Sequence, residues 1–283
     1  MSAEVRAGDP LPLRNSRRRP SGRHRSPDRL SVPPNAPALV VAVPGFACAE
    51  SDDISAEVAA SAGASCPGVD VRVGYLEGEK ANLATVLAAL RPTVEAMPSA
   101  VVVPLMTSPD PRAGAVLSKA VAEAGVAVLL TGHLAPHPLL AEALHARLAE
   151  AGLARAGRTG ALSISSAAGG VLLGAVGGEQ ALQEAGIVAV LLASRLAVPV
   201  VPALLSDAAS LDEATERLHE ARAASLALAP CFIGPEIDPT ALAAAAAQTG
   251  ARHAAPLGAH PAIGQLVAIR YGAALQDPRI ALR

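Results

Sequence analysis

The 283-residue sequence has almost no aromatic residues: it contains two Tyr, two Phe and no Trp. Because hydrophobic residues still make up 51% of the chain, its core has to be built from closely packed Ala, Val and Leu. No apolar run reaches the roughly 18 to 20 uninterrupted residues of a membrane span, and the first residues lack the apolar segment of a secretory signal peptide. The sequence therefore predicts a cytoplasmic protein without a membrane partner.

Several chemical motifs are also missing. The three cysteines (Cys48, Cys66 and Cys231) are widely spaced and form no Cys-x-x-Cys pair, which argues against a disulfide framework or a zinc knuckle. Neither a phosphate-binding Gly-x-x-x-x-Gly-Lys-Ser/Thr loop nor a complete Gly-x-Gly-x-x-Gly follows a predicted strand, and no Gly-x-Ser-x-Gly or Ser-x-x-Lys nucleophile motif is present. These absences argue against an organic cofactor and against covalent hydrolysis.

Charge is distributed unevenly along the chain. Residues 1–36 contain eight Arg against three acidic residues, whereas the whole chain has a net charge of −2. A segment rich in Arg, Pro and Ser buries too little apolar surface to offset the entropy of ordering, so residues 1–36 are predicted to form a disordered basic tail. Because this tail has no aromatic side chains to stack on bases, no nucleic-acid partner is predicted.

From Ala38 onward, short apolar runs alternate with longer stretches rich in Ala and Leu, which is typical of an α/β fold with a parallel sheet. The predicted strands span residues 39–43, 69–76, 100–106, 126–131, 171–176, 198–205, 226–233 and 253–256. The predicted helices include residues 82–90, 111–123, 138–148, 212–224, 239–248 and 261–274. A proline stands near the start of four of these helices, where a missing N–H costs nothing.

The two halves of this alternating region resemble each other. His137-Pro138 and His260-Pro261 both open a helix and are 123 residues apart, and three further matched features follow the same order at offsets of 126 to 132 residues. A repeat of this length predicts a duplicated unit. We therefore expect two α/β units, residues 37–155 and 156–283, each a four-stranded parallel sheet flanked by helices.

Ligands of open parallel sheets bind beyond the carboxyl ends of the strands, and four of the seven histidines follow strands there. We predict His133 and His137 as the chemical pair, because His133 follows the fourth strand and His137 stands at a helix start. The positive end of the helix dipole would keep the His137 imidazole neutral, as a metal ligand or base requires. The competing interpretation is that His137 and His260 only cap helix starts.

Four strings of the sequence point to a known family. They are Ala-Val-Val-Val-Pro-Leu-Met at 100–106, Pro-His-Pro-Leu-Leu-Ala-Glu-Ala-Leu at 136–144, Leu-Ala-Pro-Cys-Phe-Ile-Gly-Pro at 228–235 and Leu-Gly-Ala-His-Pro at 257–261. Together they resemble the class II sirohydrochlorin chelatases, which include the CbiX-type cobaltochelatases. The resemblance covers about residues 38–275. It implies a bilobal fold of two chelatase half-units and insertion of a divalent metal, iron or cobalt, into a polycarboxylate tetrapyrrole during sirohaem or cobalamin synthesis.

In this family, a His-Gly dipeptide after the first strand and a Gly-Tyr-His string after the third provide metal ligands and bases. The corresponding positions here read Pro44-Gly45 and Pro111-Arg112. The resemblance therefore leaves three functions open: a chelatase with different ligands, a tetrapyrrole-binding protein without insertion, and a scaffold. For a chelatase we expect metal ligands from His133, His137 and Glu77, with Asp110 as a further oxygen donor. Substrate carboxylates would then bind Arg112, Lys80 or Lys119, and the oligomeric state stays open.

Overall fold

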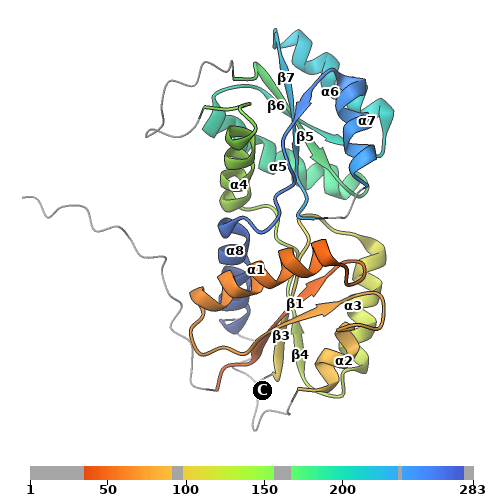
Figure 1. Ribbon diagram of the computed structural model, residues 1–283, viewed down its shortest axis with the longest axis vertical. Helices are drawn as coiled ribbons and strands as arrows, with labels where there is room; N and C mark the ends of the chain where they lie inside the picture. Colours follow the sequence, from red (N-terminus) through yellow and green to blue (C-terminus); the bar gives the residue numbers. More distant parts are fainter. Residues whose placement is uncertain (1–34, 91–97, 156–166, 235–237, 277–283) are drawn as a thin grey trace, which may run out of the picture.

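The computed structural model describes residues 35–90, 98–155, 167–234 and 238–276. It has two lobes, each built on a four-stranded, all-parallel sheet with helices on both faces (Figure 1). The predicted fold class, two repeated α/β units, is thereby confirmed. Nearly all of the predicted basic tail lies outside the described residues, as does the predicted boundary between residues 155 and 156, so both stay predictions.

The first sheet has the strand order β2-β1-β3-β4. Its strands are β1 (Ala38–Val43), β2 (Val71–Tyr75), β3 (Ala100–Pro104) and β4 (Val128–Leu130), and its lobe also holds α1 (Ala49–Ser65), α2 (Leu83–Ala88) and α3 (Pro111–Glu123). Strand β1 is buried along its whole length, with Leu39 and Val41 in one core and Val40 and Ala42 in another. Burial on both faces explains why the strand is a continuous apolar run without alternating polar residues.

The second sheet repeats this order as β6-β5-β7-β8. Its strands are β5 (Gly170–Ala175), β6 (Val200–Leu204), β7 (Leu226–Pro230) and β8 (Arg252–His253), and they alternate along the chain with α5 (Glu179–Leu196), α6 (Ala208–Glu220) and α7 (Pro239–Thr249). Helix α6 begins four residues before the predicted start because Asp207 caps it, accepting a 3.0 Å hydrogen bond from the Ala209 N–H. None of the helices in the described ranges is long and apolar enough to cross a membrane.

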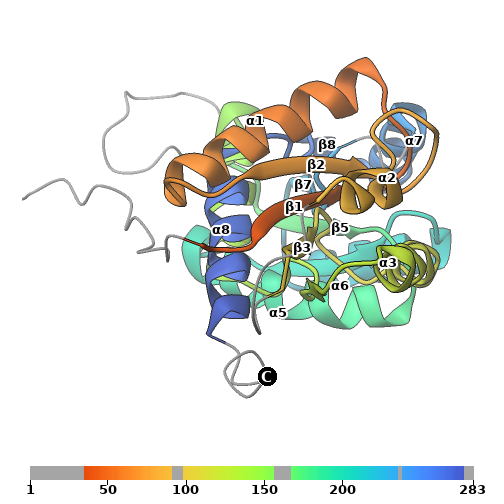
Figure 2. The same ribbon diagram turned by 90° about the horizontal axis from the view of Figure 1, so that it is seen from below.

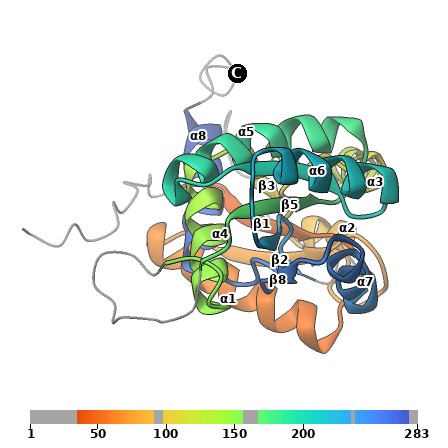
Figure 3. The ribbon, with the colours of Figure 1, turned by 90° about the horizontal axis from the view of Figure 1, so that it is seen from above.

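The last helix of each half packs on the lobe of the other half. Helix α4 (Pro138–Glu150) follows β4 but packs against α5 and β7, and α8 (Pro261–Leu275) follows β8 but packs against α1 and β3. Figure 1 shows α4 beside the upper sheet and α8 beside the lower one, and the two end-on views show α8 near α1 (Figure 2) and α4 near α5 (Figure 3). In space, each lobe therefore contains one helix from the other half of the chain.

Two arginines make matching contacts at these exchanged helices. On α4, Arg147 donates from Nε and Nη2 to the Leu257 carbonyl, at 3.1 and 2.8 Å. On α8, Arg270 donates from Nη2 to the Leu134 carbonyl at 3.0 Å. Both arginines and both leucines are separated by the repeat offset of 123 residues. Each exchanged helix thus holds the segment that leads into the other, and the repeat extends to the contacts between the lobes.

The crossing of α1 and α8 requires a glycine. A Cβ at Gly264 would lie 2.3 Å from the Ser61 Oγ and 3.2 Å from the backbone nitrogen of Ala62. Farther along α8, the buried Tyr271 hydroxyl donates a 2.7 Å hydrogen bond to the Pro37 carbonyl, just before β1. The exchanged helix therefore approaches the first lobe so closely that a methyl group at Gly264 has no room.

We expect Gly264→Ala to destabilise the protein by about 1–3 kcal/mol, because overpacking at this crossing exceeds the gain in helix propensity. Gly186→Ala is the matched control: it also lies inside a helix, but a methyl group there would meet no atom of a neighbouring element within 4 Å. That variant should be neutral or more stable by up to about 1 kcal/mol. Urea unfolding followed by circular dichroism measures both changes, and equal stability of the two variants would contradict the packing argument.

Candidate functional site

A cavity of about 350 Å³ lies where the carboxyl ends of both sheets meet. Matching segments of the repeat contribute to it: Gly45 follows β1 and Gly177 follows β5, while Thr107 follows β3 and Ile233 follows β7. The cavity therefore lies between the two halves, at the place where open parallel sheets bind ligands. Its volume is near the lower end of the range of about 300–1,000 Å³ found for small-molecule sites.

The two walls of the cavity differ in polarity. Among the described residues, every charged or hydroxyl-bearing side chain of the lining comes from the N-terminal half: Ser51, Glu77, Thr107, Ser108, Asp110 and Arg112. From the described part of the C-terminal half come only apolar or glycine residues, namely Val176, Gly177, Phe232, Ile233 and Gly234. A bound molecule would accordingly turn its charged groups toward the N-terminal half and an apolar surface toward the C-terminal half.

Two hydroxyl groups tie these walls together. The buried Thr107 donates from Oγ1 to the Cys231 carbonyl at 2.6 Å, and Ser108 donates from Oγ to the Val176 carbonyl at 2.9 Å. Sequence reasoning assigned no role to either residue. Their position in the sequence could have indicated a role, because these two hydroxyl residues directly follow the apolar run at 100–106, at the carboxyl end of a strand. These bonds fix the loop after β3 against the ends of β5 and β7.

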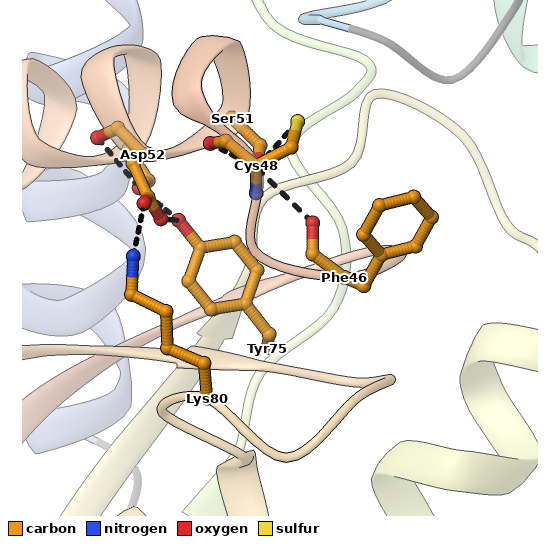
Figure 4. Close-up of polar contacts among 7 residues, drawn as sticks. Phe46, Cys48, Ser51, Asp52, Tyr75 and Lys80 are labelled. Atoms are coloured by element: carbon orange, nitrogen blue, oxygen red, sulfur yellow. Dashed lines mark hydrogen bonds and ion pairs between the residues drawn. The ribbon is translucent and has the colours of Figure 1, made fainter.

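The loop between β1 and α1 is fixed in a similar way. Gly45 has φ +76°, and its carbonyl accepts a 2.9 Å hydrogen bond from the Glu77 N–H. The Ser51 hydroxyl donates to the Phe46 carbonyl at 3.1 Å and accepts from the Cys48 N–H at 2.9 Å (Figure 4). Hydrogen bonding to Ser51 also lowers the pKa of the Cys48 thiol. The lining residues of this loop and of the turn after β2 are thus held together by backbone contacts.

Asp52, in the first turn of α1, anchors the turn after β2. It accepts hydrogen bonds from the Tyr75 hydroxyl at 2.6 Å and from Lys80 Nζ at 2.5 Å (Figure 4). These two donors, Lys80 first, hold the pKa of Asp52 below its usual value. Lys80, predicted to bind a substrate carboxylate, faces Asp52 and is not among the residues that line the cavity.

Arg112, Asp110 and Glu77 all line the cavity. Asp110 caps α3, accepting hydrogen bonds from the N–H groups of Arg112 at 2.7 Å and Ala113 at 3.3 Å, and this places Arg112 in the first turn. No side chain of the described residues pairs with the Arg112 guanidinium. Lys119, the other predicted substrate cation on α3, is exposed and lies outside the lining. Of the three predicted cations, only Arg112 is therefore placed at the cavity.

Comparison with known proteins bears on this site directly. Residues 45–151 match the CbiX family model, a range that contains most of the N-terminal half and the polar wall of the cavity. Over this range the N-terminal half is similar to the CbiX family. No curated protein sequence matches this chain. The C-terminal half has the same strand order as the N-terminal half, although the family match does not extend into it.

Two solved structures have a similar fold. One is the sirohydrochlorin chelatase SirB from Bacillus subtilis subspecies spizizenii in complex with cobalt, with 14% identity, a TM-score of 0.61, and coverage of 86% of this chain and 97% of SirB. The other is SirB from Bacillus subtilis with Fe³⁺, with 15% identity, a TM-score of 0.59, and coverage of 83% and 94%. At these identities the likeness establishes the shared fold across both lobes.

In this fold, the predicted histidines are not among the residues that line the cavity. His133 Nε2 contacts the Glu184 carboxylate on α5, across the two halves. His137 is the N-cap of α4, and its Nδ1 accepts a 3.1 Å hydrogen bond from the Leu139 N–H. The described ranges contain no cluster of three or more His, Cys, Asp or Glu side chains suited to a metal ion. A catalytic role for His133 and His137 stays a prediction.

His260 occupies the same capping position on α8 as His137 does on α4. Its Nδ1 accepts from the Ala262 N–H at 3.2 Å. Burial, and then the nearby arginine, lowers the pKa of each imidazole: Arg270 acts on His137 and Arg147 on His260. The arrangement keeps both rings neutral, and a neutral Nδ1 is what the cap requires as an acceptor.

These caps predict a loss of stability in mild acid. Because the folded-state pKa of each histidine is below the unfolded value of about 6.5, their contribution is fully present above that pH and falls as pH drops through the folded pKa. In the double variant His137→Asn/His260→Asn, the side chains still cap but no longer titrate. We expect its melting temperature to fall less than that of the wild type between pH 7.5 and 5.0. An identical fall in both proteins would exclude the caps as the cause.

Proposed function

We propose that this chain is a sirohydrochlorin chelatase-like protein that binds a polycarboxylate tetrapyrrole in the cavity and inserts a divalent metal, iron or cobalt. The observation that carries the proposal is the cavity between the two carboxyl edges, with the Arg112 guanidinium in its lining and the CbiX match around it. A guanidinium binds a carboxylate through two parallel hydrogen bonds. One substrate carboxylate would therefore be held at the start of α3.

Metal insertion requires a proton acceptor as well as a binding site. When a divalent metal binds the four pyrrole nitrogens, two N–H protons have to leave the macrocycle. Glu77 supports this role best, because it lines the cavity from the turn after β2 and none of the described side chains binds its carboxylate. Asp110 also lines the cavity, but its carboxylate already accepts two hydrogen bonds from α3. Carboxylate oxygens would also accept iron or cobalt on its way to the ring.

A second candidate function is tetrapyrrole binding without insertion. It is favoured by a specific observation: Pro44 and Arg112 both line the cavity, and they stand where the family resemblance places imidazoles. In this case Arg112 would replace a metal ligand by a cation for the substrate. A role in sirohaem or cobalamin synthesis would follow only if the protein inserts the metal. A scaffold, by contrast, would bind no tetrapyrrole at all.

Titration of the purified protein with sirohydrochlorin, followed by absorbance, tests the binding step. We expect Arg112→Ala to weaken binding by about 10- to 100-fold, the equivalent of losing a hydrogen bond to a charged group. Lys119→Ala is the matched control, because it removes the same charge from an exposed position on the same helix. Equal effects of the two variants would mean that only net charge matters. If the wild type does not bind sirohydrochlorin, a scaffold function is the candidate that remains.

Adding Fe²⁺ or Co²⁺ to the bound complex tests insertion against the spontaneous reaction. Because Glu77 lines the cavity, we expect Glu77→Gln to lower the insertion rate by about tenfold or more without changing the affinity for sirohydrochlorin. His133→Asn and His137→Asn test the alternative assignment, in which an imidazole accepts the protons. A fall in rate confined to the histidine variants would instead assign proton transfer to an imidazole. No acceleration by the wild type would support binding without insertion.

A further inference from the structure

Phe46 is one of the few large apolar side chains that are exposed among the described residues. The chain has only two phenylalanines, and while Phe232 is 2% exposed within the cavity lining, Phe46 is 62% exposed. It directly follows Gly45, another residue of the lining. Both phenylalanines of an aromatic-poor chain are therefore at or next to the same cavity.

The backbone of Phe46 is held on both sides. Its carbonyl accepts the 3.1 Å hydrogen bond from Ser51 Oγ, and the preceding Gly45 carbonyl accepts from the Glu77 N–H. On its other side, a Cβ at Gly78 would lie only 3.3 Å from the Phe46 Cβ, so the turn after β2 lies close to Phe46. The backbone that carries the ring is thus fixed before any ligand binds, which lowers the entropy cost of binding.

The ring itself takes no part in the neighbouring polar contacts. Figure 4 shows it pointing away from Asp52, Tyr75 and Lys80, and only the backbone carbonyl of Phe46 is hydrogen bonded there. Nothing in the hydrogen-bond network of the described residues requires an aromatic side chain at this position. In the described part of the chain, the ring is therefore free of hydrogen-bonded neighbours that would compete with a ligand for its face.

The size of the cavity suggests what the ring contacts. A cavity of about 350 Å³ is near the lower end of the range for drug-sized ligands, and a polycarboxylate macrocycle is larger than these. Part of the macrocycle would therefore lie at the mouth, where its apolar faces would meet water. Val116, another lining residue, is also 39% exposed. An aromatic ring beside the mouth can cover such a face by offset stacking or edge-to-face contact.

We propose that Phe46 is the aromatic contact for the planar macrocycle at the cavity mouth, and that it makes the site selective for flat, conjugated ligands. This inference rests on the proposed tetrapyrrole binding. The polar wall, through Arg112, then recognises the carboxylate, whereas Phe46 recognises the ring system. Linear polycarboxylates without a macrocycle would use the first contact only.

The first experiment uses the absence of tryptophan from the chain. Phe46→Trp creates a protein with a single Trp, whose fluorescence should be quenched strongly as sirohydrochlorin is added. Ile187→Trp is the control, because Ile187 is 52% exposed on α5 and lies outside the cavity lining. Quenching that is no stronger at position 46 than at position 187 would overturn the inference.

The second experiment measures affinity by absorbance. We expect Phe46→Ala to weaken sirohydrochlorin binding by about three- to tenfold, from the loss of an aromatic contact, with Phe46→Leu between the wild type and Ala. Ile187→Ala should bind as the wild type does. If the wild type binds and Phe46→Ala binds equally well, Phe46 has no such role. The same conclusion holds if Phe46→Ala changes the oligomeric state but leaves the affinity unchanged. If the wild type does not bind, the proposed function itself fails.

Discussion

The exchange of α4 and α8 between the lobes is the constraint on which the rest of the structure depends. Each of these helices completes the core of the lobe built by the other half, and Arg147 and Arg270 bind the carbonyl groups that lead into the opposite helix. Neither half can therefore bury its sheet without the other. Since both lobes are fixed by reciprocal contacts, the carboxyl edges of the two sheets face each other, and the cavity between them follows from the topology.

Duplication produced two similar walls, but the side chains on them have become different. Thr107 and Ser108 in the first half donate hydrogen bonds to carbonyl groups of the second, so the polar half holds the apolar half in place. The matching loop after β7 offers Phe232, Ile233 and Gly234 to the cavity. Among the described residues, one copy of the unit thus supplies the charged groups of the lining and the other supplies an apolar surface.

Much of the fold was predictable because its signals are local. Helix α3 spans the predicted residues 111–123, since Pro111 and the Asp110 cap define its start in the sequence itself. Helix α1 was not among the predicted ranges, because its buried face includes Ser51 and Ser55 rather than large apolar residues. The site was harder to predict. A histidine before a proline at a helix start looks the same in sequence whether it binds a ligand or caps the helix, and only the Leu139 N–H contact identifies His137 as a cap.

The charges of the cavity lining lie on both sides of β1. Glu77 follows β2, whereas Asp110 and Arg112 follow β3, and these strands are roughly 10 Å apart between their axes. On the β3 side, two N–H groups of α3 already bind the Asp110 carboxylate, and the start of the helix adds the positive end of its dipole to the Arg112 guanidinium, which favours an anion. On the β2 side, Glu77 would attract a cation instead. Under the proposed function, a substrate carboxylate would therefore lie on the Arg112 side of β1, and a metal ion would approach on the Glu77 side.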